Sequence, residues 1–140
     1  MASIVIDASA AVPWVLSDER TASSENFYAQ VCVTPSLYHA PAIWLWEVGN
    51  LLMNAVRRKR LTPALAQEGL EHLKLCQIQV ANVPSAHKQS QILRLALTHD
   101  LSFYDASYLE LVLSLNGQLA SADAKLVSAA KSCGVQCINL

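Results

Sequence analysis

The sequence predicts an α/β protein, a three-layer α/β/α sandwich with a central parallel sheet of four to five short strands. Short apolar runs that resemble buried strands alternate with longer segments of helical period along the chain. Such alternation favours a parallel sheet with helices packed on both faces. The 140 residues can bury a sizeable core, and no linker or internal repeat interrupts them. We therefore expect a single domain over residues 1–140.

The individual elements follow from these patterns. We expect strands at residues 3–7, 36–40, 78–83, 118–121 and 135–140. We expect helices at residues 9–17, 22–32, 43–60, 62–76, 86–98, 103–115 and 123–132. Thr62 and Pro63 can open the helix in which they stand, and Gly117 and Gly134 come just past the ends of two others, as C-terminal caps do.

Composition restricts the setting and the partners. Apolar residues make up 53% of the chain and charged residues 15%, well below the usual quarter or so, so part of the surface is expected to be covered by another subunit or partner. The formal net charge is −1, and any binding to nucleic acid must therefore depend on local basic patches.

Cysteine usage and the start of the chain indicate a cytoplasmic protein. The four cysteines form no CxxC pair, which favours buried, reduced thiols. The chain enters a strand at once in "MASIVID", without a basic leader, and no apolar run approaches the length that spans a bilayer. We expect a soluble, cytoplasmic protein with no membrane partner.

The first expected strand ends in a carboxylate. In "SIVIDASA", residues 3–10, Asp7 directly follows three β-branched residues, and Ser9 stands two residues later. In open α/β sheets, ligand sites form at the carboxyl ends of the strands, where loops lead into helix N-termini. Asp7 is therefore a candidate site residue, although it could also simply cap the next helix.

Three further acidic residues occupy comparable positions. Glu47 lies within the apolar helix "AIWLWEVGNLLMNAV", with Asn50 on the same face. Asp105 stands at the start of a helix in "LSFYDASYLEL", and Asp123 follows a short strand in "LASADAKLV". Ser102 and Asp105 have the spacing of a capping box, with Asp in place of the usual Glu, and Ser121 or Asp123 could cap the helix that follows. Glu47 has no cap to make, so its ionised form needs a cation or a partner.

Together the four carboxylates predict a metal site. Carboxylates at close quarters repel one another, and a divalent cation compensates that repulsion. The ligands on offer are hard oxygens, which favours Mg²⁺ or Mn²⁺ over zinc, and the four histidines lack zinc-site spacing. The sequence contains no GxSxG elbow, Walker A loop or GxGxxG fingerprint, so it indicates no nucleotide cradle.

The motifs that carry these acids resemble those of the PIN-domain nucleases, and within them the VapC-type toxin ribonucleases of toxin–antitoxin pairs. The matching pieces are "VIDASA", "WEVGN", "LSFYDASYL" and "LASADAKLVSAAKSCGV", in this order over nearly the whole chain. Ser121 stands where the family often has Thr, which keeps the hydroxyl.

This resemblance implies a metal-dependent endoribonuclease that hydrolyses RNA through a metal-activated water. The carboxylates that would hold Mg²⁺, or Mn²⁺ in its place, are Asp7, Glu47, Asp105 and Asp123. The groups that would orient them are Ser9, Asn50 and Ser121. The resemblance also implies a homodimer and a cognate antitoxin that silences the enzyme.

A basic run closes the Glu47 helix and is the candidate contact for RNA. It consists of Arg57, Arg58, Lys59 and Arg60. These cations could bind phosphate, or they could be a solvated helix end that complements the dipole. The aromatic residues Trp14, Trp44, Trp46, Phe27 and Tyr28 could stack on bases, but a core or dimer role is the more common one.

Two other functions remain open. A phosphoryl-transfer domain with Asp7 as nucleophile would usually carry Asp-x-Asp or an acidic pair, and Ala8 and Ser9 follow here instead. A catalytically inactive PIN-like module that binds protein or RNA could lose an acid, and here all four positions are filled.

Overall fold

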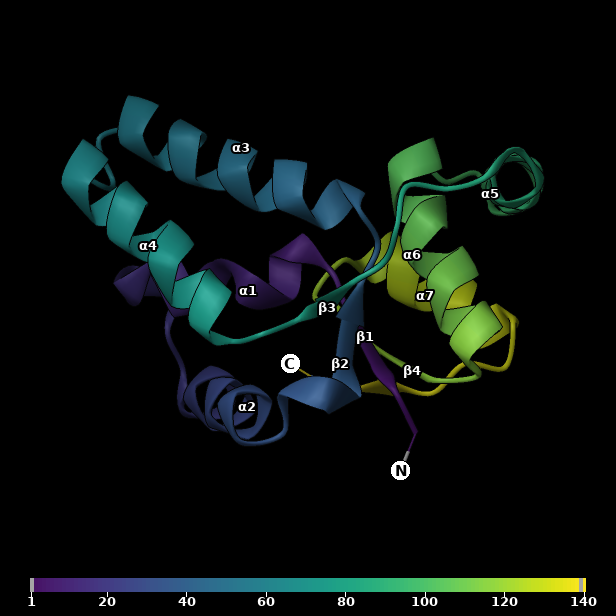
Figure 1. Cartoon of the computed structure of the whole chain (residues 1–140), viewed down its shortest axis with the longest axis horizontal. Coiled ribbons are helices and arrows are strands. Elements are labelled where there is room, and N and C mark those ends of the chain that lie inside the picture. The colour runs from purple at the N-terminus through teal and green to yellow at the C-terminus, as the bar shows by residue number, and fades with distance from the viewer. Residues whose placement is uncertain (1, 139) are drawn as a thin grey trace.

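The computed structural model describes residues 2–138 and residue 140, and it confirms the predicted fold class (Figure 1). Within these residues one sheet contains five strands: β1 (Ile4–Ile6), β2 (Tyr38–Ala40), β3 (Gln79–Val80), β4 (Gln118–Ala120) and β5 (Cys137–Ile138). All pairs are parallel, in the order β3-β2-β1-β4-β5. The last expected strand, 135–140, is shorter than predicted, and Asn139 lies outside the described residues.

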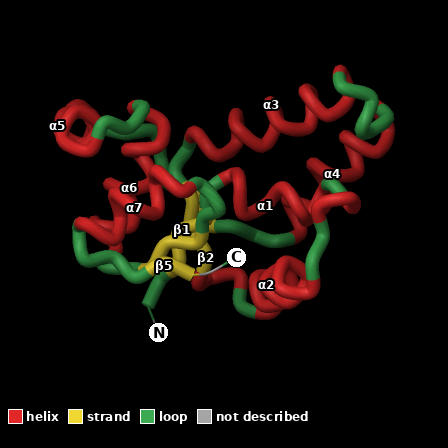
Figure 2. Tube along the Cα trace, turned by 180° about the vertical axis from the view of Figure 1, so that it is seen from behind, coloured by secondary structure: helices red, strands yellow, loops and turns green. Residues whose placement is uncertain are grey.

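The helices form two layers around this sheet. Their bounds are α1 (Ala8–Val15), α2 (Ala22–Val33), α3 (Ile43–Arg57), α4 (Pro63–Leu75), α5 (Ala86–His99), α6 (Phe103–Leu115) and α7 (Ala124–Ser132). Helices α1 to α4 gather on one side of the sheet and α5 to α7 on the other, as both views show (Figures 1 and 2). Two short 3-10 helices, η1 (Ser17–Glu19) and η2 (Pro35–Leu37), precede α2 and β2.

Some helices end at other residues than expected, because residues with positive φ end them. Helix α3 ends at Arg57 instead of residue 60, because Lys59 adopts φ 60° and turns the chain. Gly134, at φ 80°, follows α7 as predicted. After α6, however, the left-handed residue is Asn116, at φ 50°, and not Gly117. Gly117 instead lets the chain pass close to the β1 segment, since a Cβ there would collide with a backbone carbonyl.

The core lies between the sheet and both helix layers. Val5 and Leu119 on neighbouring strands are fully buried, as are Val31 on the α2 side and Leu109 on the α6 side. Among the four cysteines the expectation of burial is wrong for Cys32, which is exposed. None of the helices in the described part of the chain combines the length and apolarity needed to traverse a lipid bilayer.

Candidate active site

Asp7 directly follows β1 and accepts hydrogen bonds from three groups. Its Oδ1 accepts hydrogen bonds from Ser9 Oγ (2.6 Å) and from the backbone N–H of Ala10 (3.2 Å), which makes it the N-cap of α1. Its Oδ2 accepts from Ser121 Oγ (2.7 Å). The residue is 5% exposed, and this burial raises its pKa, while the three hydrogen bonds oppose the rise.

Ser121 and Ser9 tie the ends of β1 and β4 together. Ser121, directly after β4, accepts a hydrogen bond from the N–H of Asp123 (3.0 Å) as well as donating to Asp7. Ser9 Oγ accepts from the N–H of Ala122 (2.9 Å). Because β1 and β4 are neighbouring parallel strands, their carboxyl ends meet at one edge of the sheet, and the two hydroxyls fix the spacing of the acids there.

Asp123 starts α7. Its Oδ1 caps this helix by accepting from the N–H groups of Lys125 (3.0 Å) and Leu126 (3.1 Å). The capping role that the sequence left open is therefore present. It occupies one carboxylate oxygen of Asp123.

Glu47 reaches the same edge from the second turn of α3. Tyr108 Oη, on α6, donates a hydrogen bond to Glu47 Oε1 at 2.6 Å. The pKa of Glu47 is raised by burial first and then by the negative charges of Asp105 and Asp7, and the bond from Tyr108 opposes that rise. Burial and the neighbouring Glu47 likewise raise the pKa of Tyr108, so its hydroxyl remains a donor.

Asp105 stands in the first turn of α6. Its own backbone N–H is capped by Ser102 Oγ (3.0 Å). Burial raises the pKa of Asp105, and the charge of Asp123 raises it further, whereas Ser102 and Lys125 lower it. Asp105 therefore lies within electrostatic range of both Glu47 and Asp123.

These four residues, called here the four-carboxylate cluster, lie near enough to one another for their negative charges to repel. Each carboxylate lies within electrostatic range of two others; the pairs are Asp7–Asp123, Asp123–Asp105, Asp105–Glu47 and Glu47–Asp7. In the part of the chain that the structure describes, none of the four forms an ion pair with a lysine or arginine. Lys125 offsets part of the charge at Asp105 from a greater distance, and its own ion pair is with Asp100, so the edge of the sheet keeps a surplus of negative charge.

The donor set fits a hard divalent cation. It consists of carboxylate oxygens, supported by hydroxyls that hold the acids in place. Within residues 2–138 and 140, no three His, Cys, Asp or Glu side chains are placed to ligate one ion together. Mg²⁺ needs no such cage, because it usually keeps several waters and binds through one or two carboxylates. The cluster therefore suits Mg²⁺ better than a cation that must be fully enclosed.

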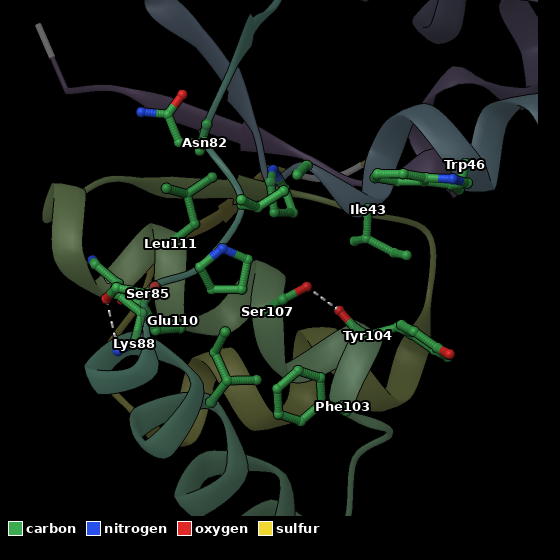
Figure 3. A pocket seen from close by; sticks show the side chains of 16 residues that line it. Ile43, Trp46, Asn82, Ser85, Lys88, Phe103, Tyr104, Ser107, Glu110 and Leu111 are labelled. Carbon is green, nitrogen blue, oxygen red and sulfur yellow. Dashed lines mark hydrogen bonds and ion pairs between the residues drawn. The ribbon is translucent and has the colours of Figure 1, made fainter.

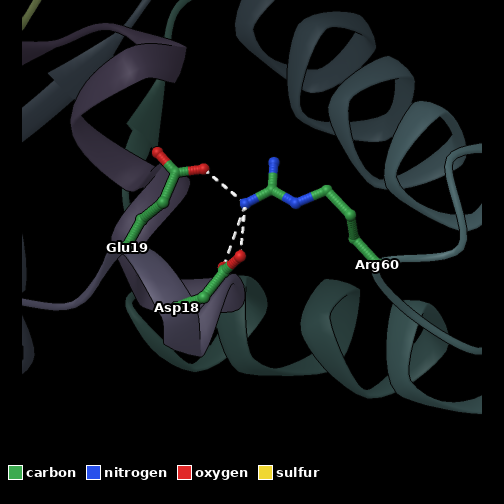
Figure 4. A network of polar contacts seen from close by, with 3 residues as sticks. All are labelled: Asp18, Glu19 and Arg60. Atoms are coloured by element: carbon green, nitrogen blue, oxygen red, sulfur yellow. Dashed lines mark hydrogen bonds and ion pairs between the residues drawn. The ribbon is translucent and has the colours of Figure 1, made fainter.

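The other predicted site residues fall into two groups. Asn50 shares the helix of Glu47 but is exposed, and among the described residues its side chain makes no hydrogen bond. The four basic residues all lie exposed at the end of α3. Arg60 is engaged: its Nη2 contacts both oxygens of Asp18 at 2.9 Å and Glu19 Oε2 at 2.7 Å (Figure 4). This ion pair fastens the end of α3 to η1, so Arg60 is the least available of the four for phosphate.

Sequence reasoning missed Tyr108. A signal was present, because Tyr108 follows Asp105 by three residues and therefore shares its helix face. What the sequence could not supply is the partner, since Glu47 stands 61 residues away.

Comparisons with known proteins identify the family of the chain. The model of the PIN domain family matches residues 4–132. The chain belongs to the PIN domain family. It is 28% identical over 127 residues to Ribonuclease VapC3 of Pyrobaculum aerophilum, which covers 88% of this chain and 91% of that protein. The resemblance to VapC-type PIN-domain nucleases that the motifs predicted is thereby confirmed.

Two solved structures share the fold of this PIN domain. PAE2754 from Pyrobaculum aerophilum superposes with a TM-score of 0.75 at 24% identity, over 97% of this chain and 83% of that one. FitAcB from Neisseria gonorrhoeae gives a TM-score of 0.65 at 17% identity, over 97% and 96% of the two chains.

Proposed function

We propose that this PIN domain is a metal-dependent endoribonuclease toxin that acts in the cytoplasm and is silenced by a cognate antitoxin. The observation that carries the proposal is the four-carboxylate cluster at the carboxyl edge of the sheet, whose charge no lysine or arginine of the described residues pairs with. Membership of the PIN family and the likeness to a ribonuclease, VapC3, support RNA as the substrate.

The residues of the chain have separable tasks in this reaction. Asp7, Glu47, Asp105 and Asp123 would hold one or two Mg²⁺ ions, with Mn²⁺ as a substitute. When bound, the cation lowers the pKa of water and offsets negative charge on the phosphate oxygens. Ser9 and Ser121 orient Asp7 through bonds of 2.6 and 2.7 Å, and Tyr108 orients Glu47. No nucleophilic side chain is required.

Cleavage of RNA by the purified protein tests the proposal. Pooled cellular RNA is incubated with Mg²⁺, with Mn²⁺ and with chelator, beside Glu47→Gln and the matched variant Glu68→Gln on the exposed face of α4. We expect cleavage with either metal, none with chelator or with Glu47→Gln, and unchanged cleavage with Glu68→Gln. Cleavage that withstands the chelator or the Glu47→Gln change would contradict the mechanism.

The same experiment in cells separates the nuclease from the other two functions. An enzyme toxin should inhibit growth on expression and lose this effect with Asp7→Asn, whereas a binding module should tolerate that isosteric change. A phosphoryl-transfer domain would instead yield protein phosphorylated at Asp7.

The basic end of α3 is the proposed contact for the RNA backbone. Arg57 stands ten residues after Glu47, which corresponds to about 15 Å along the helix axis, so it can meet phosphates outside the cleaved linkage. Changing Arg57 and Arg58 to Ala should flatten the dependence of RNA binding on salt, by about one unit of slope for each phosphate that the protein no longer neutralises. Arg60→Ala is the control, because its guanidinium already pairs with Asp18 and Glu19.

A homodimer is the proposed assembly. Leu93 and Leu97 lie one helical turn apart on α5 and are 52% and 77% exposed, which gives this helix an apolar outer face for a second copy. Sedimentation velocity should show a dimer, and Leu97→Lys should shift it towards monomer. The same substitution at Leu65, exposed on α4, should leave the dimer intact.

A further inference from the structure

A pocket of about 500 Å³ opens between the start of α3, the loop after β3 and helix α6 (Figure 3). Its walls are the turn from β2 into α3, the loop 81–85 that follows β3, the first two turns of α5 and one face of α6. It therefore lies at the carboxyl ends of β2 and β3, while Asp7 and Asp123 lie near the ends of β1 and β4. Neighbouring strands are about 5 Å apart, so the pocket and the cluster share one edge of the sheet.

Helices α3 and α6, which contain Glu47 and Asp105, also contribute aromatic side chains to the rim of this pocket. Trp46 directly precedes Glu47 on α3, and Tyr104 directly precedes Asp105 on α6. The rim aromatics Trp46, Tyr104 and Phe103 are 62%, 58% and 39% exposed. Flat aromatic side chains that stay open to solvent suit stacking on an unpaired base.

One ion pair lies in the wall of the pocket, which is mostly apolar but also contains Asn82, Ser85 and Ser107. Lys88 Nζ donates to Glu110 Oε2 at 3.1 Å, and the Glu110 side chain is 11% exposed (Figure 3). Among the described residues Glu110 Oε1 accepts no hydrogen bond, although it borders the pocket and is not sealed from solvent. Glu110 therefore keeps one free acceptor oxygen, which a donor group of a ligand in the pocket can occupy in place of water.

We infer that this pocket holds an unpaired nucleobase of the RNA next to the cleaved linkage, and that guanine fits it best. This inference rests on the proposed function. The Watson–Crick edge of guanine sets one acceptor, O6, beside two donors, N1–H and N2–H. Lys88 can donate to the first, and the free oxygen of Glu110 can accept from the others. An apolar protein side chain in the pocket would offer no hydrogen-bond partner to Lys88 or to Glu110.

Binding of mononucleotides to the metal-free protein tests the assignment. Trp14 and Trp44 are buried, so Trp46 is the tryptophan whose fluorescence a stacked base can quench. GMP, AMP, CMP and UMP are titrated in chelator, with inorganic phosphate as the control for phosphate alone. We expect saturable quenching that is strongest for GMP, and none with phosphate.

Two variants locate the contact. Glu110→Gln keeps the shape of the side chain but removes the charge that guanine donors would meet, and it should weaken GMP binding by about tenfold or more. The same change at Glu71, exposed on α4, should have no effect. Tyr104→Ala, at a side chain too exposed to be needed for folding, should weaken all four nucleotides alike.

The outcomes separate this site from the proposed function. If RNA is cleaved but GMP does not quench, or if the four nucleotides bind equally, the assignment is overturned while the nuclease stands. If GMP binds selectively but RNA is not cleaved, the pocket stands and the nuclease fails. If Trp46 emission shifts to the red on dilution as a dimer dissociates, the pocket faces a second copy and the assignment is overturned.

Discussion

Replacing Ser121 by Ala should destabilise the protein far more than the loss of one small hydroxyl suggests. Ser121 is 5% exposed, and its Oγ both donates to Asp7 Oδ2 at 2.7 Å and accepts from the N–H of Asp123 at 3.0 Å. The substitution removes both bonds at once. It also leaves a buried carboxylate oxygen without that donor, where water cannot easily replace it.

The magnitude follows from the two bonds. A hydrogen bond to a charged group contributes about 1.5–3 kcal/mol and a neutral one about 1 kcal/mol, so we expect a loss of about 3 kcal/mol in the free energy of unfolding. For a chain of this size, that loss corresponds to a fall of about 10 °C in Tm.

Urea denaturation at pH 8 in chelator measures this loss directly. Ser114→Ala is the matched control, because Ser114 is exposed and its Oγ donates to a carbonyl of its own helix. It should change the free energy of unfolding by less than about 0.5 kcal/mol. In an Asp7→Asn background the cost of Ser121→Ala should shrink by at least about 1 kcal/mol, since the charged acceptor is gone. A loss below about 0.5 kcal/mol, or an undiminished loss in that background, would refute the reasoning.

Three further predictions follow from single residues. Tyr108→Phe removes the hydroxyl that donates to Glu47. In a metal titration it should raise the Mg²⁺ concentration for half-maximal RNA cleavage by about tenfold. Gly49→Ala should raise the free energy of unfolding in urea by up to about 1 kcal/mol, because a Cβ there meets nothing within 4 Å, whereas Gly117→Ala should lower it by collision with backbone. Iodoacetamide at pH 8 should label Cys32, which is exposed, but not Cys76, whose pKa burial raises to about 12, and mass spectrometry would show the site.

What the sequence predicts well is local. Thr62 Oγ1 accepts from the N–H of Leu65 and caps α4, as the Thr-Pro pair indicated. The apolar residues before Asp7 predicted the strand that this residue follows. The strand order could not be read in this way. The order depends on where each helical connection places the next strand in the sheet. Strand β3 adds little information, because it pairs through only two exposed residues.

What the sequence could not predict are contacts between distant positions. Ser121 reaches Asp7 across 114 residues, and Arg60 reaches Asp18 across 42. The first pair could be suspected because both residues follow strands. The second could not, since four adjacent basic residues look alike in sequence, and only the turn at Lys59 directs Arg60 back towards η1.

The structural role of the acids and the catalytic role proposed for them are compatible. Asp123 uses Oδ1 to cap α7, and among the described residues its Oδ2 accepts no hydrogen bond, so one oxygen holds the carboxylate in place and the other is free for a ligand. A cap of this kind fixes the carboxylate before any cation arrives, and it therefore lowers the entropy that metal binding must remove. Asp7 is fixed still more tightly, by three bonds in a buried setting. The helix-capping pattern that offered a purely structural explanation of these acids is thus the device that would position them for chemistry.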